Sequence, residues 1–285
     1  MRYSADVRLE PTAFRAETNK GFFSGIQEAT TADERRCGIL LVGARDYKSI
    51  LLRHAQACLR WDRRPSYWSH AALVLGWPDS GLSSAHGVEV TLEPEDSWLQ
   101  VPEWNGVTTF RLARYLDQHK YPNLCFAAVS FLPAKGAKHG GRKRRGLPAA
   151  PDPKVSIEHA ARQPNLDRLR YPFWDWLGVW SRYAHSPQAT PNPVVDSVPI
   201  PGAALCEYAF EAGALDLTPG ATAPNATPEH FWSTLRFWSR RLDSRGATVR
   251  AWKIIGDPET KPHDMLKNSL PEQCDLLRNL AGSSS

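Results

Sequence analysis

The chain has 285 residues, of which 42% are hydrophobic and 23% charged, and its formal net charge is +5. This is the composition of an ordinary globular protein, and the length is enough to build a core without disulfides or metal ions. Much of the positive charge falls in one run, residues 142–145, which lies among Pro, Gly and Ala without interleaved aromatic residues. Such a run is usually a solvated loop and only sometimes an anionic-membrane patch, so we do not expect nucleic-acid binding.

Five cysteines are widely spaced and form no C-x-x-C pair. This spacing argues against a zinc knuckle, a thioredoxin-like site and a disulfide framework, and it indicates synthesis in a reducing compartment. The first residues lack the apolar core of a signal peptide, and no run of about 18 apolar residues could span a membrane. We expect synthesis in the cytoplasm and, if the protein acts outside the cell, export by a signal-independent route.

Apolar runs and alternating patterns predict strands at residues 38–43, 67–75, 87–92, 107–112, 124–132 and 248–255, with 87–92 half exposed. A short helical or turn segment around Tyr115 joins two of them. Helical spacing predicts helices at 47–59, 155–162, 173–183 and 203–212, and Thr227-Pro228-Glu229 is a typical helix start. Strands come first and helices cluster behind them, which is typical of an α+β fold.

The chain divides into three parts by composition. Residues 1–36 are polar without strong periodicity, and we interpret them as a leader or a peripheral cap. Residues 37–256 form one domain, with a flexible basic insertion near 133–153 that is rich in Pro, Gly, Lys and Arg. Residues 257–285 are a C-terminal tail.

Tryptophan is unusually abundant, with eleven residues. Large aromatic side chains either fill a core, which we favour, or line a groove for a sugar, peptide or acyl chain. The segment 173–180, Phe-Trp-Asp-Trp-Leu-Gly-Val-Trp, poses the same choice between packing in the core and lying at a membrane interface. The core is again the interpretation we favour.

Cys206 follows a Pro-Gly break and precedes residues that favour a helix. Near a helix start the dipole lowers the pKa of a thiol, and free backbone N–H groups can hold an oxyanion. Cys206 is therefore a candidate nucleophile. It can equally be one more buried small residue, as most free cysteines are.

His70 begins the apolar half of one expected strand, and Glu89 lies between two valines on the next. An imidazole can act as a general base, and a carboxylate can orient it through a ring N–H. Each residue also has an ordinary explanation, as a structural histidine and a solvent-facing acid. His86 is a spare candidate for either role. The nine histidines show no H-x-x-x-H or H-E-x-x-H spacing, so we expect no metal ion and no cofactor.

Four segments carry a resemblance to a known family: Gly38-Ile-Leu-Leu-Val-Gly43, Trp68-Ser-His-Ala-Ala-Leu-Val-Leu-Gly76, Gly87-Val-Glu-Val90 and Leu205-Cys-Glu-Tyr-Ala-Phe210. In order and spacing they resemble the permuted NlpC/P60 group of papain-like enzymes, which includes the YiiX-like bacterial proteins and is related to lecithin:retinol acyltransferase. Together they span roughly residues 37–235. Glu207, directly after the cysteine, departs from the family pattern.

The resemblance implies a circularly permuted papain-like fold, in which an antiparallel sheet packs against a Cys-bearing helix. It implies Cys206 as nucleophile, His70 as base and Glu89 as the group that orients His70. The implied chemistry is acyl transfer through a thioester.

The resemblance leaves three functions open. The first is cleavage of amide bonds in peptidoglycan peptides, as an antibacterial effector delivered by a secretion-system carrier and countered by an immunity protein. The second is a hydrolase or acyltransferase acting on the acyl bonds of phospholipids, with peripheral membrane contact. The third is a binding module that kept the fold and lost the chemistry.

Overall fold

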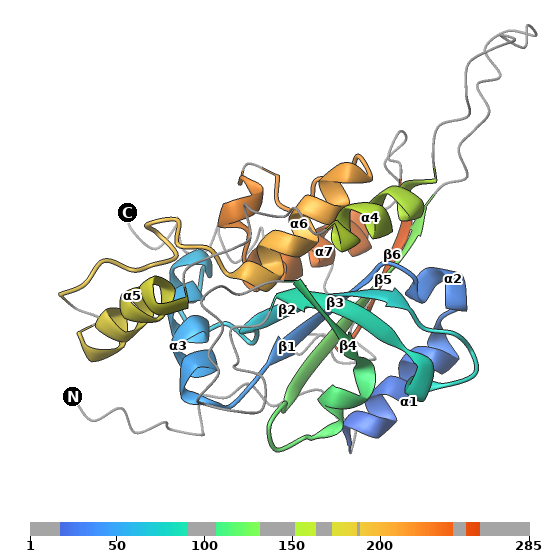
Figure 1. Cartoon of the computed structure of the whole chain (residues 1–285), viewed down its shortest axis with the longest axis horizontal. Coiled ribbons are helices and arrows are strands. Elements are labelled where there is room, and N and C mark those ends of the chain that lie inside the picture. The colour runs from blue at the N-terminus through green and yellow to red at the C-terminus, as the bar shows by residue number, and fades with distance from the viewer. Residues whose placement is uncertain are drawn as a thin grey trace, which may run out of the picture.

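The computed structural model describes residues 18–90, 107–131, 152–163, 173–186, 189–219, 221–241 and 249–256. Within these ranges the chain forms one six-stranded antiparallel sheet with helices packed on both of its faces (Figure 1). The expected α+β class is therefore confirmed. The predicted tail at 257–285 and nearly all of the predicted insertion lie outside the described residues.

All six predicted strands are present. They are β1 (Gly38–Gly43), β2 (His70–Gly76), β3 (His86–Val90), β4 (Val107–Arg111), β5 (Asn123–Phe131) and β6 (Val249–Ile255). Their order across the sheet is β4-β3-β2-β1-β5-β6, and every neighbouring pair runs antiparallel. β1, the most completely apolar run, pairs on both sides in the centre of the sheet.

The predicted helices are also present, together with two in the N-terminal segment, Asn19–Ala29 and Ala32–Arg35, that the sequence did not predict. The helices are α1 (Asn19–Ala29), α2 (Ala32–Arg35), α3 (Tyr47–Ala55), α4 (Pro153–Arg162), α5 (Phe173–His185), α6 (Pro201–Ala212) and α7 (Pro228–Arg241). The described residues also form short 3-10 turns at η2 (Gln56–Leu59), η3 (Leu82–Ser84), η4 (Leu112–Leu116) and η6 (Ala223–Asn225). None of the helices in the described ranges is both long and apolar enough to cross a membrane.

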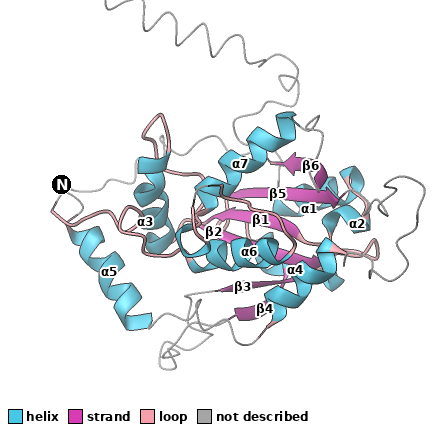
Figure 2. Ribbon diagram, turned by 90° about the horizontal axis from the view of Figure 1, so that it is seen from above, coloured by secondary structure: helices cyan, strands magenta, loops and turns pink. Residues whose placement is uncertain are grey.

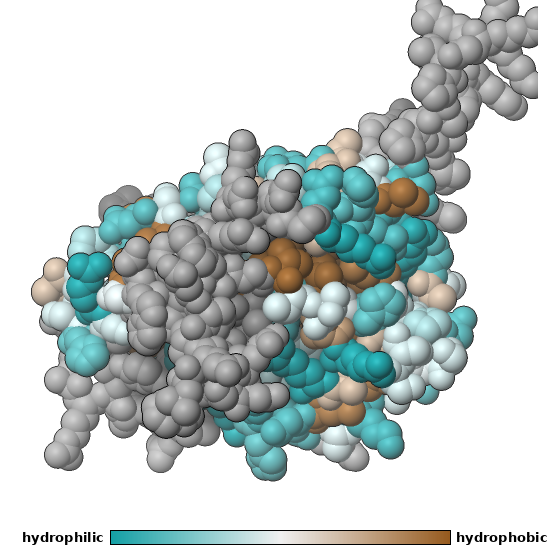
Figure 3. Space-filling model, viewed as in Figure 1, coloured by the Kyte–Doolittle hydropathy of each residue, from teal (hydrophilic) through white to brown (hydrophobic). Residues whose placement is uncertain are grey.

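Alternation along β1 divides the core into two layers, because successive side chains of a strand point to opposite faces. Ile39 and Leu41 belong to a cluster that also contains side chains of α4, α5, α6 and α7. Leu40 and Val42 belong to a second cluster under α1. Figure 2 shows α4, α6 and α7 lying over the sheet. The surface seen in Figure 3 is mostly hydrophilic, with an apolar band below α4 and α6 where helices and sheet meet.

The Trp-rich segment 173–180 and the N-terminal helix α1 both contribute side chains to this core. Trp176 and Trp180 of α5 are buried in the cluster beneath the helices, and the indole of Trp176 donates to the carbonyl of Pro199 at 3.2 Å. In the N-terminal segment, α1 buries Phe22, Phe23 and Ile26 against the opposite face. From residue 19 onward, the segment interpreted as a leader or cap covers one face of the sheet.

Two local predictions were wrong. β3 is not half exposed, since all its residues from Gly87 to Val90 are buried. The helix carrying Cys206 begins at Pro201 rather than at residue 203, because proline fits the first turn of a helix, where its missing N–H has no partner to lose. Cys206 is thus the sixth residue of α6, and its own N–H lies beyond the four unpaired N–H groups of a helix start.

Candidate functional site

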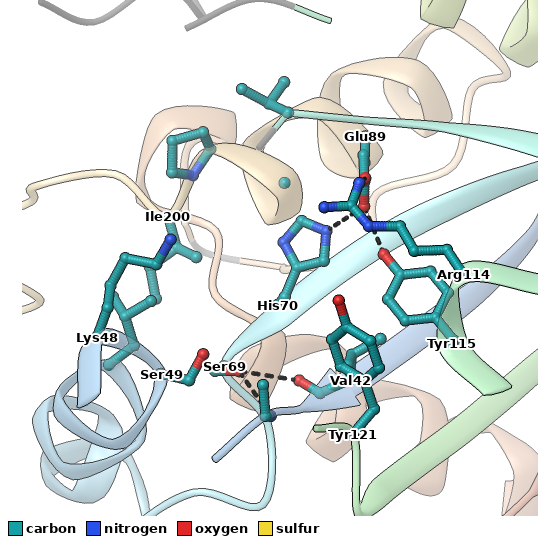
Figure 4. Close-up of a pocket in the computed structure, with 15 residues that line it drawn as sticks. Val42, Lys48, Ser49, Ser69, His70, Glu89, Arg114, Tyr115, Tyr121 and Ile200 are labelled. Carbon is teal, nitrogen blue, oxygen red and sulfur yellow. Dashed lines mark hydrogen bonds and ion pairs between the residues drawn. The ribbon is translucent and has the colours of Figure 1, made fainter. Parts of the chain in front are cut away.

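A pocket lies where α3, the ends of β2 and β3, η4 and the start of α6 come together. It holds about 560 Å³ of open space, part of it continuous with solvent. In Figure 4, His70 stands between Lys48 and Ser49 on one side and Glu89, Arg114 and Tyr115 on the other. The lining residues are Val42, Ala44, Lys48, Ser49, Leu52, Ser69, His70, Glu89, Val90, Arg114, Tyr115, Tyr121, Ile200, Pro201 and Gly202.

His70 and Glu89 are brought together, as the sequence predicted. The imidazole Nε2 lies 2.9 Å from Glu89 Oε2, and the exposed fractions of the two side chains are 24% and 2%. The sheet register explains the contact, because Leu73 pairs with Val88 and Glu89 therefore lies diagonally across from His70. The start of β2 is fixed by Ser69, whose N–H donates to the carbonyl of Val42 at 2.8 Å.

Two further side chains hold the Glu89 carboxylate. Arg114 Nη1 donates to Oε1 at 2.5 Å, and the hydroxyl of Tyr115 donates to Oε2. Both donors lie on η4, which α1 holds in place, since the Asn19 side chain donates to the carbonyls of Tyr115 and Tyr121 at 2.8 and 2.9 Å. The N-terminal helix therefore supports the site directly.

These contacts keep Glu89 ionised. Burial alone would raise its pKa, but the hydrogen bond with His70, the hydroxyl of Tyr115 and the charge of Arg114 together lower it. In turn, burial and the nearby Glu89 carboxylate raise the pKa of Tyr115 well above its usual value. Tyr115 is therefore a hydrogen-bond donor to a fixed negative charge.

An ionised carboxylate only accepts hydrogen bonds, so His70 Nε2 must carry a proton. In the neutral ring the other nitrogen, Nδ1, is then the acceptor. A Cβ built on Gly202 would lie 2.8 Å from this Nδ1 and 2.6 Å from the neighbouring Cε1. Residue 202, at the second position of α6, therefore lies directly against this imidazole and carries no side chain that could act as a nucleophile.

The start of α6 rests so closely on β2 that only glycine fits at position 202. The same Cβ would approach the backbone carbonyl oxygen of Ala71 to 2.4 Å, a distance that real Cβ atoms do not show. Glycine allows this approach because it has no side chain.

Cys206, the predicted nucleophile, is not brought to the pocket. It lies four residues beyond Gly202, which is about 6 Å along the helix axis, and its side chain is fully buried in the core cluster with Ala71 and Leu73. Among the described residues no hydrogen bond joins its thiol to His70. Burial, and then the charge of Glu207, raise the pKa of this thiol far above its usual value. The low thiol pKa expected at a helix start is therefore not found, because Cys206 lies in the second turn, inside the core.

The spare candidate, His86, lies elsewhere. It is exposed at the opposite end of the sheet, where its ring covers Gly76 and its Nδ1 lies 3.2 Å from the carbonyl of Ser84. Within the described ranges, no group of three or more His, Cys, Asp or Glu side chains could hold a metal ion.

Most of the lining could not be predicted from the sequence, including the polar residues Lys48, Arg114 and Tyr115 and the glycine at position 202. One signal was available for Arg114 and Tyr115, because they directly follow the strand that pairs with the strand of Glu89. No signal marked Gly202, whose importance comes from the close approach of α6 to β2.

Comparison of the sequence with models of protein families and with curated proteins finds no match in either. The resemblance to the permuted NlpC/P60 group therefore rests on the four sequence segments.

Proposed function

We propose that this chain is a ligand-binding protein on a permuted papain-like scaffold, and that its pocket holds a carboxylate-bearing peptide such as those of peptidoglycan. The observation that carries the proposal is the glycine opposite His70. A His–acid pair that no thiol of the described residues contacts can orient and bind a ligand, but without a thiol in reach it cannot form a thioester.

The charges of the pocket favour an anionic ligand. Lys48 and Arg114 contribute two cations to the lining and Glu89 contributes one carboxylate, which Arg114 binds, so one positive charge is in excess. Because Glu89 is surrounded by His70, Tyr115 and Arg114, it presents little negative charge to an incoming group. A guanidinium and an ammonium are the groups that proteins commonly use to bind carboxylates.

The apolar part of the lining suits the rest of a peptide. Val42, Leu52, Val90 and Ile200 contribute aliphatic surface beside the polar groups. Ligand sites commonly combine such a surface with a few polar groups that set orientation. In peptidoglycan peptides, aliphatic side chains and free carboxylates alternate over a few atoms.

Calorimetric titration with soluble peptidoglycan peptides tests this proposal, using one peptide with free carboxylates and the same peptide amidated. We expect binding of the free acid, weaker binding of the amide, and a loss of on the order of tenfold in affinity for Lys48→Gln. Lys20→Gln, an exposed lysine on α1, is the matched control. Equal binding by wild type and Lys48→Gln would contradict the proposal.

The second candidate is the cysteine-dependent hydrolase predicted from the sequence, acting on peptidoglycan amides or phospholipid acyl bonds. One observation favours it, the 2.9 Å contact between His70 and Glu89. This candidate requires that the wild-type protein releases peptides from peptidoglycan or fatty acid from phospholipid. Both Cys206→Ala and His70→Ala should abolish that release. Release that survives both substitutions would remove this candidate.

A further inference from the structure

The loop between η2 and β2 presents a tryptophan to solvent. Trp61 is 90% exposed, the largest exposed fraction among the large hydrophobic side chains of the described residues. Leu59, two residues earlier, is exposed as well. An indole left in water forgoes the stabilisation that burial of its large apolar surface would give.

The residues around Trp61 are firmly held, so its exposure does not come from a loose loop. The guanidinium of Arg60 binds both carboxylate oxygens of Asp62 at 2.9 Å and Glu229 Oε1 at 3.3 Å. It also lies over the rings of Tyr67 and Trp232, at 5.0 and 5.3 Å from their centroids. Arg60 is buried and anchors the loop from within.

A strained residue closes the loop. Arg63 adopts the left-handed conformation, with φ of 55°, which is rarely occupied by residues other than glycine. Its N–H donates to the carbonyl of Arg60 at 3.2 Å, and its Nη1 donates to the carbonyl of Cys58 at 3.0 Å. These contacts offset the strain and direct Trp61 outward. Strained backbone that the surroundings hold in place is common at functional surfaces.

The charge beside Trp61 is positive. Arg63 and Arg64 are exposed, and within the described part of the chain neither forms an ion pair with a carboxylate. Asp62 binds Arg60 through both of its oxygens, and its Oδ1 also accepts from the backbone N–H of Arg64 at 3.1 Å, so it offsets part of this charge. The exposed indole is therefore flanked by two exposed cationic side chains, against the one carboxylate of Asp62.

A further exposed apolar side chain, Val195, lies on a turn that is tied to the end of α3. Val195 is 66% exposed, and the same turn is tied to the end of α3 because the Asn192 side chain donates to the carbonyl of Ala55 at 2.8 Å. The residue after Ala55 begins η2, which leads into the Trp61 loop.

We propose that the loop of residues 59–64 docks on an anionic lipid bilayer, with the Trp61 indole at the level of the headgroups and Arg63 and Arg64 against lipid phosphates. Tryptophan prefers the interface between water and acyl chains, and each basic residue near an anionic surface adds to the attraction. The proposal does not depend on the ligand of the pocket.

Co-sedimentation of the full chain with phosphatidylcholine vesicles, with and without phosphatidylglycerol, tests this proposal. We expect binding to the anionic vesicles that weakens with added salt. Trp61→Ser and, separately, the double variant Arg63→Asn/Arg64→Gln should each lower the partition coefficient by on the order of tenfold. Asparagine is chosen at position 63 because it tolerates the left-handed conformation. The basic run at 142–145 is unchanged in every variant, so the differences report on the loop.

Val155→Ser is the matched control, because Val155 is an exposed apolar residue on α4. It should bind like wild type, and thermal unfolding of every variant shows whether it is folded. Absence of binding to anionic vesicles, or equal binding by folded Trp61→Ser, would overturn the proposal. Self-association that is lost in Trp61→Ser, with no binding to vesicles, would show instead that a protein surface covers the loop.

Discussion

Gly202 lies against the imidazole of His70 at the start of α6, where any other residue would bring its Cβ to within 2.6 Å of the ring. A His–acid pair is thus present, while the α6 residue that its Nδ1 faces carries no side chain. The proposed binding function rests on this relationship.

Gly202→Ala should destabilise the protein by about 1–3 kcal/mol, as overpacking commonly does. The added methyl group would meet the backbone oxygen of Ala71 at 2.4 Å and the ring of His70, so α6 must shift. Urea unfolding followed by circular dichroism measures the change.

Gly25→Ala in α1 is the control for Gly202→Ala. A Cβ at Gly25 meets nothing within 4 Å, so alanine should stabilise that helix by about 0.5–1 kcal/mol through its better helix propensity. If both variants were equally stable, the close packing of α6 on β2 would be refuted.

Native alkylation should spare Cys206. Its thiol is fully buried, and burial raises its pKa, whereas Cys58 on η2 is half-buried. We expect iodoacetamide to modify Cys58 at least about a hundredfold faster than Cys206, which reacts only when the core opens. Peptide mass spectrometry over a time course measures both rates, and rapid labelling of Cys206 near pH 7 would contradict the structure.

Glu89 should make stability fall in acid. Its folded-state pKa lies below the ordinary value of 4.5, so its stabilisation is present above that pH and is lost as the pH falls through the folded-state pKa. Glu89→Gln should cost about 1–3 kcal/mol at pH 7, and the difference from wild type should shrink below pH 4.5. Thermal unfolding of both proteins across this range provides the test; a constant difference would show that the charge of Glu89 is not what stabilises the fold.

Glu207 should make stability fall as the pH rises, which is opposite to the effect of Glu89. Its carboxylate is buried beneath the turn after α6, where Oε1 accepts from the N–H of Leu217 at 2.9 Å. Burial raises its pKa from 4.5 to about 7. The folded state therefore binds the proton more tightly than the unfolded state, and this group's contribution to stability falls as the pH rises from 4.5 to 7, by up to about 3 kcal/mol.

Comparison of Glu207→Gln with wild type isolates that effect, because the amide cannot ionise. The stability of the variant relative to wild type should increase between pH 5 and pH 8. A difference that stays constant would mean that Glu207 titrates alike in both states.

The order of the elements from residue 38 onward could be predicted from sequence, because periodicity marks each of them. The pairing of His70 with Glu89 is implied by the family resemblance, while the residues alone leave a solvent-facing acid open. The burial of Glu89 could not be predicted, since the Val-Glu-Val alternation is the same for an acid facing solvent and an acid covered by η4 and α1. Arg114 and Tyr115 reach Glu89 only through this tertiary packing.

The position of Cys206 in the core could not be predicted from the sequence either. A Pro-Gly pair is typical of a break before a helix, but here Pro201 and Gly202 form the first turn of α6. A shift of two residues in the helix start moves the cysteine from the pocket edge into the core. Helix boundaries are uncertain by about this much when they are inferred from sequence alone.

The most direct test of whether the pocket binds its ligand without thiol chemistry is the mass of the intact protein. This mass is measured after incubation with peptidoglycan peptides and, separately, with phospholipid vesicles. The reaction is stopped in acid, which preserves thioesters. We expect the wild-type mass to be unchanged and the substrates to remain whole. An acyl adduct located on Cys206, absent from Cys206→Ala and accompanied by released product, would contradict the proposed binding function.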